Sequence, residues 1–139
     1  MKTIYFDMDN TIADLYNVAD WANKLDNKDV TPYIEAKPMV KESTLLKIVA
    51  RGFNVGIISW LAKNCTDKNY DKAVRCAKRA WLKKQYPNVA FNEIHIVKYG
   101  TNKYSVAKDK NSILIDDNEN VRNKWKSLSL PPASIYDLT

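Results

Sequence analysis

Two short apolar runs that end directly in aspartates constrain the fold of this 139-residue chain more than any other feature of its sequence. Residues 4–6 (Ile-Tyr-Phe) precede residues 7–11 (Asp-Met-Asp-Asn-Thr), and residues 113–115 (Ile-Leu-Ile) precede Asp116 and Asp117. Apolar runs of this length, rich in β-branched and aromatic residues, predict buried strands. In open α/β sheets, ligands bind in the crevice beyond the carboxyl ends of the strands. We therefore expect the aspartates of both runs to meet at one edge of a sheet.

A group of carboxylates brought together in this way predicts a cation. Carboxylates at close range repel one another, and a positive charge between them removes that repulsion. Hard oxygen ligands suit Mg²⁺, which usually takes one or two carboxylates and leaves coordination positions for phosphate oxygens. The strand ends therefore indicate a Mg²⁺-dependent enzyme that acts on phosphates.

The composition indicates one soluble globular domain over residues 1–139, because 45% hydrophobic and 27% charged residues are ordinary values for such a chain. No apolar run approaches the roughly 20 residues that cross a bilayer, so we expect no membrane partner. The first apolar run is cut short at Asp7, which predicts no secretory signal and a cytoplasmic location.

The cysteine and histidine content excludes two further classes of site. Cys65 and Cys76 are too few and too widely spaced for a zinc site or a redox pair, and we expect both to be free thiols. His95 is the only histidine, and its place in the apolar run 94–97 predicts a sheet residue. Histidine-based catalysis therefore has almost no material in this chain.

Apolar spacing and turn residues predict strands that alternate with helices. We expect strands at residues 3–6, 53–58, 94–97 and 112–115, and a short final strand at residues 134–136. Helices are expected at residues 17–25, at residues 32–35, from Pro38 to a C-cap at Gly52, at residues 71–85, and after Asn118 through Trp125. Strands that alternate with helices indicate parallel βαβ units, and hence an α/β fold with a doubly wound sheet.

The segment from residue 63 to residue 84 carries as much charge as the whole chain. It holds two aspartates and eight basic residues, a net +6: Lys63, Lys68, Lys72, Arg75, Lys78, Arg79, Lys83 and Lys84. Such a segment could attract nucleic acid or another anionic substrate. Small and apolar residues also recur through it at helical spacing, which puts the basic residues largely on the opposite, solvated face. We favour the solvated helix face.

The polar residues at the strand ends match four motifs of a known superfamily in order. Residues 7–11 match its first motif, Ser59 follows a predicted strand as the second does, Lys103 fits the third, and Asp116-Asp117 matches the fourth. The chain thus resembles the haloacid dehalogenase (HAD) superfamily of phosphotransferases. The resemblance implies a Rossmann-like, three-layer α/β/α fold with a mostly parallel sheet of about five strands. It also implies a very small helical cap, inserted at about residues 15–37.

This resemblance implies a role for each aspartate. Asp7 is the expected nucleophile, which forms an aspartyl-phosphate. Asp9 is the expected acid that protonates the leaving oxygen and then the base that activates water. Mg²⁺ is expected to bind the side chains of Asp7 and Asp116 and the backbone carbonyl of Asp9. Asp117 is either a second ligand or a residue that orients the others, although with Asn118 it could equally cap the following helix.

Three further residues are expected to hold the phosphoryl oxygens, namely Thr11, Ser59 and Lys103. Lys103 would also offset negative charge in the transition state. Its place directly after a Gly-Thr-Asn segment favours it over the three other lysines nearby, Lys98, Lys108 and Lys110.

A closer resemblance concerns residues 78–87 and 97–103, which look like segments of small bacterial and phage HAD proteins related to 5′(3′)-deoxyribonucleotidases. It implies a small phosphorylated substrate, a nucleoside monophosphate, in a bacterium or a phage-infected host. Aromatic residues would either stack on the base or pack within the protein: Tyr16, Trp21 and Tyr33 of the cap, and Trp60 beside the phosphate site. Because so small a cap excludes little water, the substrate or the partner subunit of a homodimer would complete the site.

Two other functions stay open from the sequence. The small cap and the basic segment are compatible with a phosphatase that acts on nucleic-acid ends, whose binding would weaken with salt. A non-catalytic HAD-fold protein that binds phosphate or serves as a scaffold is the second alternative. We favour the nucleoside monophosphate phosphatase over both, because every expected catalytic position holds a competent residue.

Overall fold

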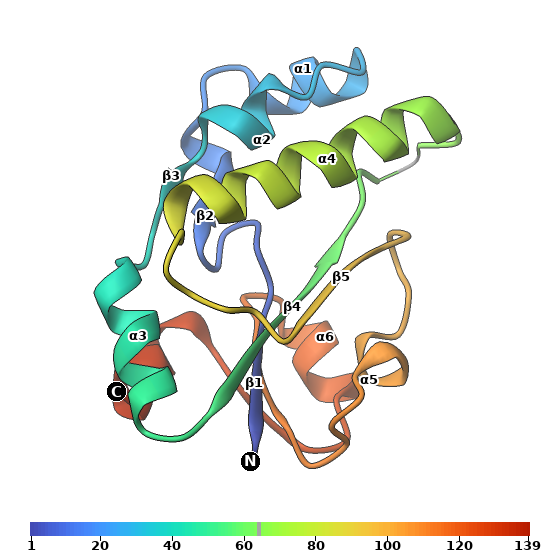
Figure 1. Ribbon diagram of the computed structural model, residues 1–139. Helices are drawn as coiled ribbons and strands as arrows, with labels where there is room; N and C mark the ends of the chain where they lie inside the picture. Colours follow the sequence, from blue (N-terminus) through green and yellow to red (C-terminus); the bar gives the residue numbers. More distant parts are fainter. Residues whose placement is uncertain (64) are drawn as a thin grey trace.

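A five-stranded parallel sheet forms the centre of the molecule (Figure 1). The structure is a computed structural model that describes residues 1–63 and 65–139. The strands lie in the order β5-β4-β1-β6-β7, and all four neighbouring pairs are parallel. Their bounds are β1 (Thr3–Phe6), β4 (Asn54–Trp60), β5 (Glu93–Val97), β6 (Ile113–Ile115) and β7 (Leu128–Leu130).

Helices flank this sheet on both sides, so the predicted Rossmann-like, three-layer α/β fold with a mostly parallel sheet of about five strands is confirmed. On one side lie α3 (Glu42–Ala50) and the 3-10 helix η2 (Pro132–Leu138), and on the other lie α5 (Lys103–Val106) and α6 (Glu119–Lys124) (Figure 1). The long helix α4 (Lys68–Gln85) crosses beyond the carboxyl ends of the strands. No helix within the described residues is both long and apolar enough to cross a membrane.

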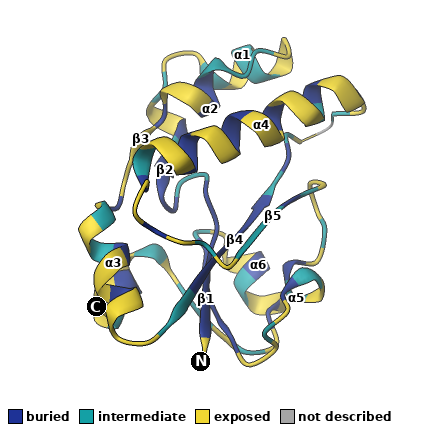
Figure 2. Cartoon of the chain, in the orientation of Figure 1, coloured by how far each residue is buried: buried dark blue, intermediate teal, exposed yellow. Residues whose placement is uncertain are grey.

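Alternate residues of β1 supply the two halves of the core. Ile4 and Phe6 lie in the cluster that includes residues of α3 and η2, whereas Tyr5 lies in the cluster that includes Trp125 after α6. All three β1 residues are fully buried (Figure 2). A strand that is covered on both faces needs apolar residues at every position, which is why the run reads as continuous and not as alternating.

The segment between residues 13 and 38, called the cap below, places two short helices in a small layer above α4 (Figure 1). It leaves the sheet through β2 (Ala13–Asp14), continues as η1 (Leu15–Asn17), α1 (Trp21–Asp26) and α2 (Thr31–Glu35), and returns through β3 (Lys37–Pro38). The two short strands pair antiparallel. Two side chains of the α4 region hold the return path, because the Trp81 indole donates to the Ala36 carbonyl (2.7 Å) and the Tyr86 hydroxyl donates to the Val40 carbonyl (2.8 Å).

Two predicted elements are wrong. Pro38 does not begin a helix: it ends β3, and α3 begins at Glu42. Residues 134–136 lie in η2 and not in a strand, because Pro131 and Pro132 start a helical turn, and the fifth strand is β7 instead. Helix α4 also begins earlier than predicted, because the Asp67 carboxylate caps it by accepting from the backbone N–H groups of residues 69 and 70.

Strand β5 is an edge of the sheet, and α4 covers its outward-facing carbonyls. The Arg75 guanidinium donates to the Ile96 carbonyl (3.1 Å), and the Arg79 guanidinium donates to the Ile94 carbonyl (3.2 Å). Open edge carbonyls are pairing sites for other strands, and charged side chains protect them. Two residues of the basic segment therefore have a structural task that the sequence did not reveal.

Gly56 is required by the ring of Tyr5. A Cβ at Gly56 would lie 2.8 Å from one Tyr5 ring carbon, and the ring crosses this position so that its hydroxyl can donate to Glu93 of β5 (2.5 Å). We expect Gly56→Ala to lower the free energy of unfolding by about 1–3 kcal/mol, which is the usual penalty for overpacking. Urea denaturation measures this change. In a Tyr5→Leu background the same substitution should have a smaller effect, and equal effects in both backgrounds would contradict the steric explanation.

Candidate active site

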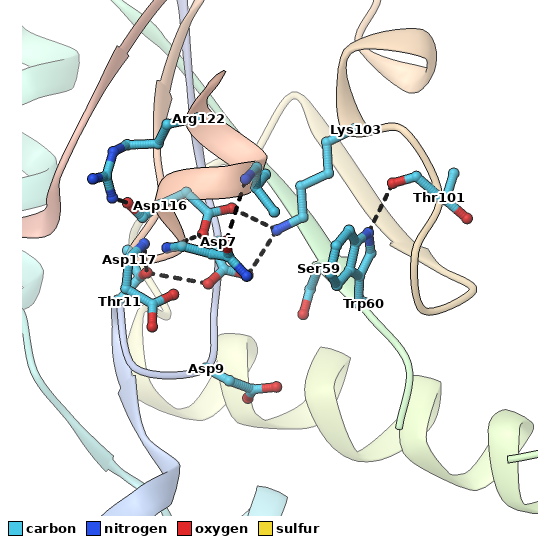
Figure 3. Close-up of polar contacts among 12 residues, drawn as sticks. Asp7, Asp9, Thr11, Ser59, Trp60, Thr101, Lys103, Asp116, Asp117 and Arg122 are labelled. Atoms are coloured by element: carbon cyan, nitrogen blue, oxygen red, sulfur yellow. Dashed lines mark hydrogen bonds and ion pairs between the residues drawn. The ribbon is translucent and has the colours of Figure 1, made fainter. Parts of the chain in front are cut away.

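The aspartates at the ends of β1 and β6 lie side by side because these strands are neighbours. Phe6 pairs with Ile115, and the backbone N–H of Asp7 donates to the Ile115 carbonyl (2.9 Å), so the next residue of each strand projects from the same edge. Carboxylate oxygens of Asp7, Asp116 and Asp117 all lie within 4.8 Å of one another (Figure 3). The parallel sheet thus brings Asp7 next to two carboxylates that follow it by more than 100 residues in the sequence.

Lys103 lies between two of these carboxylates. Its ammonium donates to Asp7 Oδ1 (2.9 Å) and to Asp116 Oδ2 (2.8 Å), and its side chain is buried (Figure 3). Burial lowers the pKa of Lys103, but the charges of the two aspartates raise it more, so the lysine stays charged. Helix α5 begins at Lys103, and the Asn102 side chain caps it. The three competing lysines of the sequence prediction are exposed: Lys98, Lys108 and Lys110.

The two other acids of this group, Asp116 and Asp117, have raised pKa values. Burial and the nearby charge of Asp7 raise the pKa of Asp116. The same two causes, in the same order, raise the pKa of Asp117 to about 7, although a hydrogen bond from the Asn10 amide (3.1 Å) partly opposes them. A divalent cation relieves repulsion of this kind, and a set of carboxylate oxygens suits Mg²⁺. The donor set therefore fits the predicted metal.

A tight loop after β1 positions the first motif. The carbonyl of Met8 accepts hydrogen bonds from the N–H groups of residues 11, 12 and 13 (2.9–3.0 Å), and Asn10 adopts a positive φ of 60°. Asparagine tolerates this left-handed conformation better than most residues, which explains why position 10 can hold an asparagine. The curled loop directs the Thr11 hydroxyl to Asp7 Oδ2 (3.1 Å), while that hydroxyl accepts from the Asp117 N–H (3.2 Å).

Asp9 lies apart from the other acids and faces α4 (Figure 3). Its side chain is 24% exposed, and its Oδ2 accepts a hydrogen bond from the Lys78 ammonium (3.0 Å). Burial raises the pKa of Asp9 above its ordinary value, the Lys78 charge opposes this shift, and the Asp7 charge adds to it. A carboxyl group whose pKa is raised in this way is suited to hold and then release a proton.

Lys78 is the residue that the sequence prediction placed wrongly. It was expected on the solvated face of the basic helix, yet its side chain is 1% exposed. The ammonium also donates to Ser59 Oγ (2.8 Å) and to the Trp60 carbonyl (2.8 Å). Position 78 lies four residues after Val74 and three before Trp81, both buried, so helical spacing puts it on the buried stripe. That spacing was the available signal, and the charge of lysine concealed it.

A cavity of about 500 Å³ opens between the aspartates and the cap, and aromatic side chains form much of its wall. The three predicted substrate-contacting residues line it, together with three more tyrosines: Tyr16, Trp21, Trp60, Tyr33, Tyr70 and Tyr99. The rings form two pairs with centroids 4.7 Å apart, Tyr16 with Trp21 and Trp60 with Tyr99. The Trp60 indole also donates to the Thr101 carbonyl (2.9 Å; Figure 3). Tyr99 has an exposed position in a loop, and the resemblance of residues 97–103 gave it no role in substrate binding.

The comparisons with known proteins support the fold. The sequence matches no protein-family model, and no curated protein is significantly similar to it. Among solved structures, the D,D-heptose 1,7-bisphosphate phosphatase from Burkholderia thailandensis matches with a TM-score of 0.56 and 11% sequence identity. The match covers 98% of this chain and 74% of that chain. At this identity the two proteins share a fold, the α/β fold that the strand-end motifs predict.

Asp117 should make the stability of the metal-free protein depend on pH, because its pKa rises from an ordinary 3.8 to about 7 on folding. Between these values the folded state keeps a proton that the unfolded state releases, so the free energy of unfolding falls as pH rises through this window. Asp117→Asn cannot ionise. In EDTA we expect this variant to have the higher Tm above about pH 7 and a Tm equal to that of the parent below about pH 4.

Thermal unfolding followed by circular dichroism at several pH values measures this difference. Asp137→Asn, at an exposed position of η2, is the matched control and should follow the parent. Parallel pH profiles for the parent and Asp117→Asn would show that Asp117 does not titrate near neutral pH in the folded chain.

Proposed function

We propose that this protein is a Mg²⁺-dependent phosphomonoester hydrolase that forms an aspartyl-phosphate on Asp7 and acts on nucleoside monophosphates. One observation carries the proposal. The Asp7 carboxylate is paired with the Lys103 ammonium on one oxygen and with the Thr11 hydroxyl on the other, beside two further acids and at the floor of an aromatic cavity. This arrangement suits an anionic nucleophile whose approach to an anionic phosphate must be assisted.

In the first step a bond forms between an oxygen of Asp7 and phosphorus while the bond from phosphorus to the alcohol oxygen breaks. A carboxylate is already ionised at neutral pH and needs no base. Asp9 gives its proton to the departing oxygen, so the alcohol leaves neutral. The raised pKa of Asp9 supports this role, because more of the group carries a proton at a given pH.

In the second step water replaces Asp7 on phosphorus. Asp9, now ionised, takes a proton from the water whose oxygen attacks phosphorus, and the bond to Asp7 breaks. The products are inorganic phosphate, ionised Asp7 and protonated Asp9, so the starting state is restored. The phosphoryl oxygens would contact Lys103, Thr11 and Ser59. The Ser59 hydroxyl accepts from Lys78, which leaves its own proton available for donation.

The carboxylates of Asp7, Asp116 and Asp117, with the backbone carbonyl of Asp9, would hold Mg²⁺, and the bound ion would supply positive charge for the approach of nucleophile to phosphate. The resemblance to the HAD superfamily implies Asp7, Asp116 and the Asp9 carbonyl as ligands, and it leaves Asp117 either a second ligand or a residue that orients the others. Lys103 complements them, because its ammonium already lies between Asp7 and Asp116.

The aromatic cavity suits a leaving group that carries a planar base. Its volume of about 500 Å³ lies within the usual range for small-molecule sites. Tyr16 and Tyr99 are each nearly half exposed, so their rings are not committed to the core, and ring faces are favourable contacts for a nucleobase. The heptose bisphosphate phosphatase acts, by its name, on a sugar phosphate, and the shared fold supports a phosphatase here. The proposal of a nucleobase rests on the aromatic cavity alone.

Asp7→Asn should remove turnover, because an amide is a poor nucleophile. With Mg²⁺ and dUMP or dTMP as substrate, we expect phosphate release to fall by roughly a thousandfold or more. A phosphate-release assay measures the rate, and far-ultraviolet circular dichroism checks the fold. Asp137→Asn, the exposed control, should retain the parent rate. Undiminished turnover by pure Asp7→Asn protein would eliminate the aspartyl-phosphate mechanism.

Mononucleotides should be better substrates than end-phosphorylated oligonucleotides, with little dependence on salt. Three basic residues of the segment that suggested nucleic acid are engaged within the protein: Arg75, Lys78 and Arg79. Rates on both substrate types, from low to moderate salt, test this preference. Faster turnover of oligonucleotides that falls steeply with salt would favour nucleic-acid ends instead. No turnover of any phosphate ester in a broad panel with Mg²⁺ would favour the non-catalytic scaffold.

A further inference from the structure

We infer that Lys78 is a positioning residue of the proposed reaction, whose ammonium fixes the Asp9 carboxylate and the Ser59 hydroxyl at the side of the cavity opposite Lys103. The inference rests on the proposed function. Its observations are independent of the contacts among Asp7, Asp116 and Asp117, because Lys78 comes from the middle of α4 and donates to Asp9 and to two groups of β4.

The hydrogen bonds of Lys78 account for its full capacity. A lysine ammonium has three N–H donors, and Asp9 Oδ2 (3.0 Å), Ser59 Oγ (2.8 Å) and the Trp60 carbonyl (2.8 Å) give three acceptors. The ammonium also lies 4.8 Å from the ring centre of Tyr33 in α2, within the range of a cation–π contact. One group thus joins the loop after β1, the end of β4 and the cap.

Stability alone does not explain a buried lysine at this position. Burial removes the ammonium from water at a large cost, which only well-placed partners offset. Apolar residues of similar size in place of buried charges are often neutral or stabilising. The neighbours of Lys78 on the buried stripe, Ala77 and Trp81, show that α4 can pack there with uncharged side chains. We therefore look for the role of the Lys78 ammonium in the groups that it contacts.

What it contacts is the carboxylate that has to meet the leaving oxygen. Within the described residues, Lys78 is the single hydrogen-bond partner of the Asp9 side chain, through Oδ2. Oδ1 therefore remains free for the leaving oxygen. An acid works only within hydrogen-bond reach of the atom that it protonates, and small displacements slow catalysis severely. Lys78 limits rotation of a side chain that would otherwise be free to turn toward solvent.

The two buried lysines contact separate groups. Lys103 pairs with Asp7 and Asp116, whereas Lys78 pairs with Asp9 and forms none of the hydrogen bonds described for the three clustered carboxylates. Loss of Lys78 should therefore disturb proton delivery and leave the affinity for Mg²⁺ unchanged. This separation gives an experiment that a general loss of structure would not imitate.

The test is the leaving-group dependence of Lys78→Met, whose side chain keeps the length of the lysine stem. Rapid-mixing measurements of the first turnover report release of the leaving group and exclude the later hydrolysis step. For a nucleoside monophosphate, whose sugar alcohol needs a proton to leave, we expect release to slow by about 10²–10⁴-fold. For p-nitrophenyl phosphate, whose phenolate leaves without a proton, we expect less than about a tenfold change.

Three measurements complete the design. Lys83→Met, at an exposed position of α4, is the matched control and should behave as the parent with both substrates. The increase in Tm on addition of Mg²⁺ should be the same for the parent and Lys78→Met. If Lys78→Met does not fold, Lys78→Gln, which keeps a polar donor, takes its place and should show the same contrast between the two leaving groups.

The outcomes separate this inference from the proposed function. Turnover by the parent with equal rate losses for both leaving groups in the Lys78 variant would reduce Lys78 to a structural role, and no loss for either would also overturn the inference. A smaller Mg²⁺ effect on Tm would move Lys78 to the metal site and contradict it too. If the parent hydrolyses neither substrate, the proposed function fails first and the inference falls with it.

Discussion

Repulsion among carboxylates at adjacent strand ends is the constraint around which this molecule is organised. A parallel sheet places the residues that follow its strands at one edge, and here Asp7, Asp116 and Asp117 occupy that edge. Burial, and after it the charge of Asp7, raises the pKa values of Asp116 and Asp117, and the repulsion would destabilise the fold without compensation. The positive groups nearby are consequences of this constraint, and each of them comes from a different part of the chain.

Two buried lysines pair with the aspartates of the site from two directions. Lys103 reaches the acids from the start of α5, where a side-chain cap fixes the helix end. Lys78 reaches Asp9 from α4, and its ammonium also lies against the ring of Tyr33 in α2. In the proposed reaction this division matters, because the nucleophile and the proton donor need different surroundings: charge neutralisation for Asp7, and a fixed orientation with a raised pKa for Asp9. Because the two lysines belong to separate helices, the surroundings of Asp7 and those of Asp9 can differ independently.

The sequence predicted what depends on local pattern. The apolar runs of β1 and β6, the aspartates after them and the helix cap at Asn118 are visible from neighbouring residues alone, and the structure shows the strands and the cap. The burial of Lys78 was not predicted, because the acceptors that offset the cost of removing its ammonium from water lie 18 or more residues away in sequence. Strand β7 was missed for a related reason: three residues with an exposed leucine carry little pattern, and pairing with β6 determines them.

The attachment of the cap to α4 bears on how fast ligands can exchange. The indole of Trp81 and the hydroxyl of Tyr86 bind the backbone on the return path of the cap, and Lys28 forms an ion pair with Asp67 (3.0 Å) at the far end of the cavity. Many enzymes open and close a lid once in each turnover, and that motion often limits the rate. Because the cap is joined to α4 at both ends, we expect the proposed reaction to proceed without such a motion. Selectivity would then depend on the resting shape of the cavity, and product release would not wait for a lid to open.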